Sequence, residues 1–193
     1  MNWAKGYGTP NRSGGPVLRR DANPFARKTP MKLQDLFLLT LKDIYYAERQ
    51  LLKALPKMAK AAQSPQLKQA FTEHRAQTEG QVERLQQIFA IIGKRAAGQT
   101  CEAILGLIQE CEELLEEATT PSAVRDAGLI ACGQAVEHYE MARYGTLAAW
   151  AGVLGMDDAL ALLRETLAEE KAADTLLNGL ATGTINAEAL QAA

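Results

Sequence analysis

The sequence predicts an all-α protein, a four-helix bundle in which one connection is long. Three observations predict it. From residue 33 onward, apolar residues recur at the three- and four-residue spacing of amphipathic helices, with no alternating strand pattern. Two of the three connections between long helical segments are tight, whereas the third takes roughly thirty residues. Polar residues also interrupt the apolar face of every long segment near its midpoint.

Composition places the chain among ordinary globular proteins. It has 193 residues, of which 47% are hydrophobic and 23% charged, which suits one domain plus a tail. No apolar run is long enough for a membrane span and no secretory signal is evident, so we expect a cytoplasmic protein without a membrane partner. The cysteines form no C-x-x-C pair, and we expect each to be a buried small residue in a reducing compartment. They are Cys101, Cys111 and Cys132.

Residues 1–30 are predicted to be a flexible basic tail. They contain several prolines and glycines and no apolar periodicity. Six Lys or Arg stand against Asp21 alone, a net charge of about +5, so the remainder carries about −7. The alternative is a docking segment or a weak nucleic-acid tether, because about five charges give only loose binding.

The first two long helices are predicted over 33–62 and 65–92. Pro56 lies inside the first and predicts a kink or a break into two pieces. Ser64 is the expected N-cap of the second, with Pro65 at its first position. Gly93 is a suitable stop.

A short helix is predicted over about 101–118, inside the long connection. Long helices follow over about 122–152 and 157–177, with Gly155 in the tight loop between them. Tight loops make antiparallel hairpins, and the long crossover joins them in the arrangement of ferritin-like bundles. We therefore expect the bundle to span 31–180 and a C-terminal tail to span 181–193.

Candidate metal ligands lie on the predicted inner faces of all four long helices. Each lies three, four or seven residues from apolar residues of its helix, spacings that place side chains on one face. The four glutamates lie within about three residues of their helix midpoints, about 5 Å of rise, so antiparallel helices bring them into one layer. The six candidates are Glu48, His74, Glu137, Glu140, Glu170 and Asp174.

Several carboxylates in an apolar layer cannot all be ionised and unpaired, because burying a bare charge is expensive. Either some hold protons or cations lie among them, and an oxygen-rich set with one imidazole suits iron or manganese. Simpler interpretations remain open. If a helix is rotated about its axis, its candidate glutamate faces solvent. Glu170 also belongs to a run of charged residues, which usually faces solvent. His74 can be an ordinary histidine of the core. Thr78 and Gln81 are expected to hydrogen-bond to the layer, and His138 points about 100° away from Glu137.

Four motifs, in order, resemble the YciF/YciE-type bacterial stress proteins over about 31–180. They are LKDIYYAERQL at 41–51, FTEHRAQTEGQVER at 71–84, VEHYEMARYGTL at 136–147 and TLAEEK at 166–171. The resemblance implies a ferritin-like fold, a homodimer, a di-iron centre and a stress-response setting. The chain departs from the wider ferritin-like pattern because neither expected Glu-x-x-His pair is present. Phe71 stands three residues before His74, and Ala173 stands three after Glu170.

Two functions from different classes follow. The first is a metal-dependent redox protein that binds two iron ions, or manganese instead, and acts as a peroxidase, a catalase or a ferroxidase. The tyrosines near the candidate ligands would serve as electron donors, hydrogen-bond partners or packing residues. The second is a non-enzymatic helical adaptor or structural stress protein with a vestigial metal site. An iron-storing cage ranks below both, and no phosphate loop or catalytic triad is present.

Overall fold

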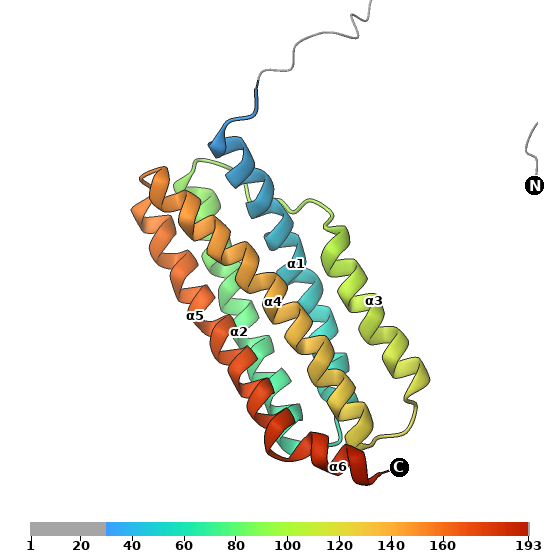
Figure 1. Ribbon diagram of the computed structural model, residues 1–193. Helices are drawn as coiled ribbons and strands as arrows, with labels where there is room; N and C mark the ends of the chain where they lie inside the picture. Colours follow the sequence, from blue (N-terminus) through green and yellow to red (C-terminus); the bar gives the residue numbers. More distant parts are fainter. Residues whose placement is uncertain (1–29, 193) are drawn as a thin grey trace, which may run out of the picture. The chain divides into compact units, whose positions relative to one another are not determined.

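The computed structural model describes residues 30–192, and the predicted basic tail lies outside this range except for Pro30. The described part contains helices and no strand. Four long helices form the bundle, and a shorter helix lies on the outside along two of them (Figure 1). The predicted all-α four-helix bundle is therefore confirmed. Its long helices are α1 (Leu33–Ala61), α2 (Pro65–Ile91), α4 (Ala123–Val153) and α5 (Asp157–Leu180), and the shorter one is α3 (Glu102–Glu117).

Local sequence signals explain most helix ends. The Ser64 hydroxyl accepts a hydrogen bond from the Leu67 amide, and Pro65 occupies the first turn of α2. Gly93 and Gly155 follow α2 and α4 with φ of 66° and 68°, a left-handed conformation that favours glycine at the end of a helix. Gly155 lies in the tight turn between α4 and α5, whereas Gly93 begins the long crossover.

The α1–α2 turn is held by the start of α4. Asp126 accepts hydrogen bonds from the Gln63 amide at 2.8 Å and the Ser64 amide at 2.7 Å. The neighbouring Arg125 guanidinium donates hydrogen bonds to the Ala61 carbonyl at the end of α1 and to the Thr119 carbonyl in the α3–α4 loop. Neither carbonyl would otherwise have a hydrogen-bond partner there. Hydrogen bonds between residues far apart in the sequence therefore hold the α1–α2 hairpin against the start of α4.

The crossover runs from α2 through α3 to α4. It contacts α1 where the Gln99 amide donates to the Lys42 carbonyl at 3.2 Å. At Gly98, a Cβ atom would lie 3.1 Å from Tyr46 Cβ, so the loop approaches α1 too closely for most side chains. α3 then packs on α1 and α4.

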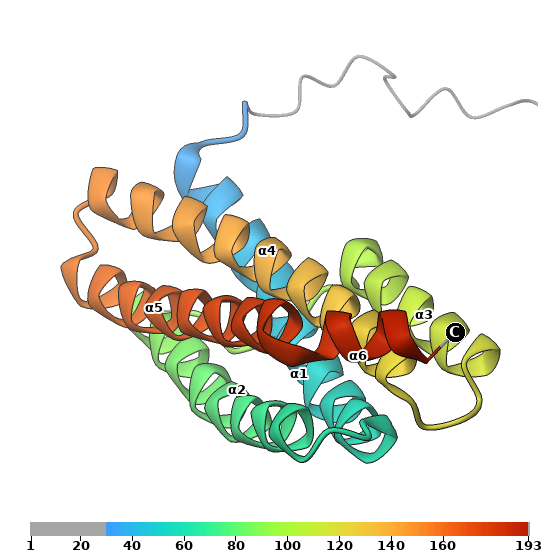
Figure 2. The same cartoon turned by 60° about the horizontal axis from the view of Figure 1, so that its bottom comes forward.

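Two predictions require correction. Of the two alternatives predicted at Pro56, a kink or a break, the break is wrong, because α1 is one continuous helix with Leu55 and Met58 buried on either side of the proline. Residues 181–191, expected as a tail, continue α5 as a π-helical turn, Ala181–Ile185, and then α6, Asn186–Gln191. Ile185 is buried, and this end of the chain packs against α4, so tertiary contact keeps it helical (Figure 2).

The core is apolar at both ends of the bundle and polar in the middle. Large buried side chains include Phe37, Phe89 and Leu129. None of the helices within residues 30–192 contains a stretch both long and apolar enough to cross a membrane. The buried polar side chains of this middle layer include Glu48, Glu140 and Glu170.

Candidate metal centre

Each long helix places an acidic or imidazole side chain in the polar middle layer. Glu48 on α1 and Glu170 on α5 are 0% exposed, and His74 on α2 is 5% exposed. Helix α4 provides two, Glu137 and Glu140, at 3% and 0%. Their spacing from apolar neighbours predicts this orientation, because residues three or four apart share a helix face. The structure therefore brings five of the six sequence-predicted candidates into the core.

Four of these residues form a compact group. His74, Glu137, Glu140 and Glu170 each offer one ligand atom, and these atoms all lie within 4.8 Å of one another. His74 Nε2 lies 3.3 Å from Glu137 Oε1 and 3.9 Å from Glu170 Oε2. The group therefore has three carboxylates and one imidazole around a common centre.

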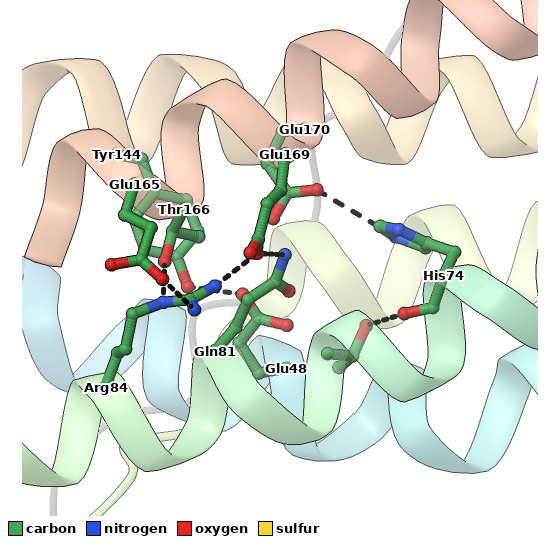
Figure 3. A network of polar contacts seen from close by, with 10 residues as sticks. Glu48, His74, Gln81, Arg84, Tyr144, Glu165, Thr166, Glu169 and Glu170 are labelled. Carbon is green, nitrogen blue, oxygen red and sulfur yellow. Dashed lines mark hydrogen bonds and ion pairs between the residues drawn. The ribbon is translucent and has the colours of Figure 1, made fainter.

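Glu48 adjoins this group on the α1 side. The Tyr144 hydroxyl donates a hydrogen bond to Glu48 Oε1, which orients that carboxyl group within the core (Figure 3). After burial, the charge of Glu48 is the next cause that raises the pKa of Glu140 on α4. Glu48 Oε2 has no hydrogen-bond partner among the described residues. This oxygen is available to a ligand.

Burial dominates the protonation of the cluster. Loss of water raises the pKa of Glu48 to about 7 and that of Glu137 to about 8. Burial, followed by the charges of Glu48 and Glu137, raises the pKa of Glu170 to about 11, and Glu140 is raised well above its ordinary value for similar reasons. Burial lowers the pKa of His74, so its contacts with carboxylates join a neutral imidazole. Without a cation, the carboxyl groups of the cluster therefore retain protons to a higher pH than exposed glutamates do.

A second set of polar side chains borders the cluster between α2 and α5. The Arg84 guanidinium donates to the Thr166 hydroxyl at 2.9 Å and to the carboxylates of Glu165 and Glu169 (Figure 3). Gln81 Nε2 donates to the same Glu169 oxygen at 3.1 Å. This network holds Glu169 in an ion pair with Arg84, beside Glu170. Arg84 was not among the residues predicted for the site. It follows Gln81 by three residues, so the two side chains share one face of α2.

Two of the remaining predicted residues lie elsewhere. Asp174 is half-buried, and its Oδ1 accepts from Gln134 Nε2 at 3.2 Å and lies 3.3 Å from His138 Nε2. It is not brought into the compact group. Thr78, expected to bond to the layer, donates instead to the His74 carbonyl at 3.0 Å within its own helix. His138 is exposed, in agreement with its predicted direction away from Glu137.

A cavity of about 110 Å³ leads to the cluster between α2 and α5. His74 and Glu137 line its inner part, and exposed Glu73 and Gln77 lie toward solvent. Ala173 also lines it, at the position where the wider pattern of ferritin-like proteins would place a histidine. The small side chain of Ala173 occupies little of this cavity.

The donor set fits a metal ion. Within the described residues, both oxygens of Glu140 and of Glu170, both nitrogens of His74 and one oxygen of Glu137 have no hydrogen-bond partner despite being buried. Buried polar atoms normally find partners, so such a concentration calls for a missing one. Carboxylate oxygens with imidazole suit iron and manganese. The cluster can therefore hold a metal ion.

Comparisons with known proteins identify one matching family model and several similar proteins. The family model described as Domain of unknown function (DUF892) matches residues 32–190. Protein YciF of Escherichia coli (strain K12) is 46% identical over 158 residues, which is 81% of this chain and 95% of that protein. The crystal structure of this E. coli stress protein superimposes with a TM-score of 0.76, covering 80% of this chain and 98% of that one. YcfI of Rhodopseudomonas palustris, described as a candidate structural protein, is 49% identical with a TM-score of 0.75, covering 80% and 97%.

Proposed function

Because the chain belongs to the DUF892 family of YciF-like stress proteins, we propose that its buried cluster is a di-metal centre, with iron as the principal metal. The proposed activity is oxidation of iron(II) or consumption of peroxide, with manganese as the alternative metal. Iron in such a site would supply electrons to peroxide or oxygen as iron(II) is oxidised to iron(III). The setting would be the stress response of a bacterium, as the description of its relative YciF indicates.

The observation that carries the proposal is the set of unpartnered buried ligand atoms. His74, Glu137, Glu140 and Glu170 bring ligand atoms to within 4.8 Å of one another. Glu48 extends the set on the α1 side, which provides five side chains for two ions. Burial and then the repulsion between carboxylates raise the pKa values of Glu140 and Glu170, and a cation among them would offset both effects.

Neighbouring side chains of this chain would orient the ligands. The Tyr144 hydroxyl holds one oxygen of Glu48, so that Oε2 is the oxygen left to bind. Arg84 and Gln81 hold Glu169 toward α2, which keeps this second carboxylate of α5 in an ion pair and outside the ligand set. Ligands supported in this way keep their geometry when a metal binds.

The cavity between α2 and α5 would be the route to the centre. It reaches His74 and Glu137 from solvent, and the exposed Glu73 at its mouth would attract cations. Peroxide and oxygen are small enough to use the same path. The proposal therefore includes a direction of access, from the α2–α5 side.

Metal content tests the proposal directly. The full chain, loaded with iron(II) without oxygen and desalted, should retain about two ions, as expected for a two-metal carboxylate site. Glu48→Ala and Glu140→Gln should lower this content sharply with the helical circular dichroism signal largely intact. Glu79→Ala, which removes an exposed glutamate of α2, is the matched control and should bind as the wild type does. Unchanged iron stoichiometry in both core variants would refute the centre.

The second candidate function is a structural or adaptor role with a vestigial site. The observation that favours it is the description of YcfI as a candidate structural protein, at 49% identity. Peroxide consumption separates the two functions, because the redox protein should consume peroxide when loaded with iron or manganese and lose this activity in Glu140→Gln. A metal-free protein that gains no activity on loading would favour the structural role.

A further inference from the structure

Two of the three cysteines face each other across the α3–α4 contact. Cys111 on α3 and Cys132 on α4 both line a small, mainly apolar cavity that also borders α1. Both are free thiols. The two thiols interact, because each shifts the pKa of the other. Neither residue belongs to the polar middle layer.

The packing of α3 on α4 explains why the thiols meet. Gly128 of α4 lies against Leu114 of α3, where a Cβ atom would come within 2.7 Å of Leu114 Cδ2. Glycine therefore allows an unusually close approach of the two helices. The two helices are antiparallel, so one turn forward from Gly128 on α4 lies opposite one turn backward from Leu114 on α3. These positions are Cys132 and Cys111. A disulfide requires such closeness.

The two thiols differ in exposure and in acidity. Cys132 is half-buried, whereas Cys111 is 7% exposed. The hydrogen bond from the Cys111 thiol holds the pKa of Cys132 below its usual value, against the opposing effect of burial. The same bond and burial raise the pKa of Cys111. Cys132 is thus both the more accessible sulfur and the better nucleophile.

We propose that Cys111 and Cys132 are a redox-active pair that hydrogen peroxide converts into an intramolecular disulfide joining α3 to α4. The Cys132 thiolate attacks one peroxide oxygen, the O–O bond breaks, and the products are a sulfenic acid and hydroxide, which takes up a proton to become water. The Cys111 sulfur then attacks the sulfenic sulfur, loses its proton, and expels the second oxygen as another water. Two thiols lose two electrons in total and one peroxide is reduced to two waters.

The third cysteine provides an internal comparison. Cys101 lies at the start of α3, ten residues from Cys111, about 15 Å along a helix axis. It is buried, and its sulfur lies 2.9 Å from the Tyr139 hydroxyl. It has no second thiol within reach in the described chain, so peroxide should spare it while the pair reacts.

Thiol counting on the full chain tests the proposal. Chelator-treated protein is exposed to one equivalent of hydrogen peroxide, denatured, and titrated with a thiol reagent. We expect the wild type and Cys101→Ser to lose two thiols each, to remain single chains on non-reducing gels, and to recover both thiols with dithiothreitol. Cys111→Ser and Cys132→Ser should form no intramolecular bridge. The chelator removes metal from the experiment, so the result does not depend on the proposed metal centre.

Peptide mapping of the oxidised wild type keeps the test valid even if a cysteine variant folds poorly. The expected product is a single cross-linked peptide pair containing Cys111 and Cys132. Three intact thiols, a bridge that includes Cys101, or a disulfide between two chains would each overturn the proposal.

Discussion

The strongest prediction concerns how stability depends on pH with and without metal. In the metal-free protein, Glu137 has a folded-state pKa of about 8 against an ordinary value of 4.5. The native state therefore keeps a proton that the unfolded chain loses above pH 4.5, so stability must fall as the pH rises toward 8. Because Glu140 and Glu170 are raised by the same burial, their contributions have the same sign.

The magnitude follows from linkage. One retained proton corresponds to about 1.4 kcal/mol per pH unit, so Glu137 alone should remove about 2 kcal/mol between about pH 5.5 and pH 7. For a domain of this size, that loss lowers the melting temperature by roughly 4–8 °C. The other buried glutamates should enlarge the effect, whereas His74, whose pKa burial lowers, opposes it as the pH rises toward 6.5.

Metal should reverse the slope. A bound cation favours the ionised form of each ligand carboxyl group, so the folded-state pKa values lie below those of the unfolded chain. The stability that these carboxyl groups contribute is then fully present above their pKa in the unfolded chain. It is lost as the pH falls through their lower pKa in the folded protein. Free metal also stabilises the native state by mass action.

Thermal unfolding followed by far-UV circular dichroism, for chelated and iron-loaded protein across this pH range, measures both slopes. Glu137→Gln should flatten the metal-free profile, whereas the exposed Glu79→Gln should leave it unchanged. Two superimposable profiles would mean that no core site binds metal. Metal-free stability that rises from pH 5.5 to 7 would refute the reasoning about retained protons.

Three further predictions use other parts of the chain. Ala173→Leu should slow iron loading through the cavity between α2 and α5 while the final stoichiometry stays unchanged, and equal stopped-flow rates would argue against this route. Asp126→Ala should lower the urea unfolding free energy by about 2–4 kcal/mol, because the Gln63 and Ser64 amides lose a buried charged acceptor; a loss below about 1 kcal/mol would contradict this role. Deleting residues 1–30 should leave the melting temperature nearly unchanged, whereas a large drop would show that the segment packs on the bundle.

The ends of helices were predictable where a single residue type strongly favours the start or the end of a helix. Ser64 and Pro65 start α2, and Gly93 and Gly155 end the helices before them, and in each case the cause lies within a few residues. The continuous path of α1 through Pro56 was not predictable in this way. A proline removes one hydrogen bond, and whether the helix continues depends on packing on both sides of it.

The C-terminal segment shows the same limit. Residues 181–191 contain Gly183 and two threonines, which are weak helix formers. Their helical structure depends on Ile185 being buried and on contact with α4. Neither is visible in the local sequence, so a tail was the natural prediction.

For the site, periodicity predicted which side chains point inward but not their partners. Asp174 follows Glu170 by one helical turn, so the two residues share a face in the sequence pattern. In the structure only Glu170 enters the core, while Asp174 meets Gln134 and His138 of α4. The role of Arg84 was missed for a related reason, since its partners lie on a helix more than eighty residues away.

The polar layer also bears on the choice between the two proposed functions. A bundle that serves only as a scaffold gains nothing from buried carboxyl groups, because apolar residues of similar volume in their place are often neutral or stabilising. Here Glu140 and Glu170 remain buried without hydrogen-bond partners in the described chain, and burial opposes their ionisation. Tyr144 and Arg84 hold neighbouring carboxylates in defined orientations around them. These buried carboxyl groups oppose the metal-free fold, yet the surrounding side chains orient them. A cation-binding site requires this combination, which favours the metal centre over the adaptor.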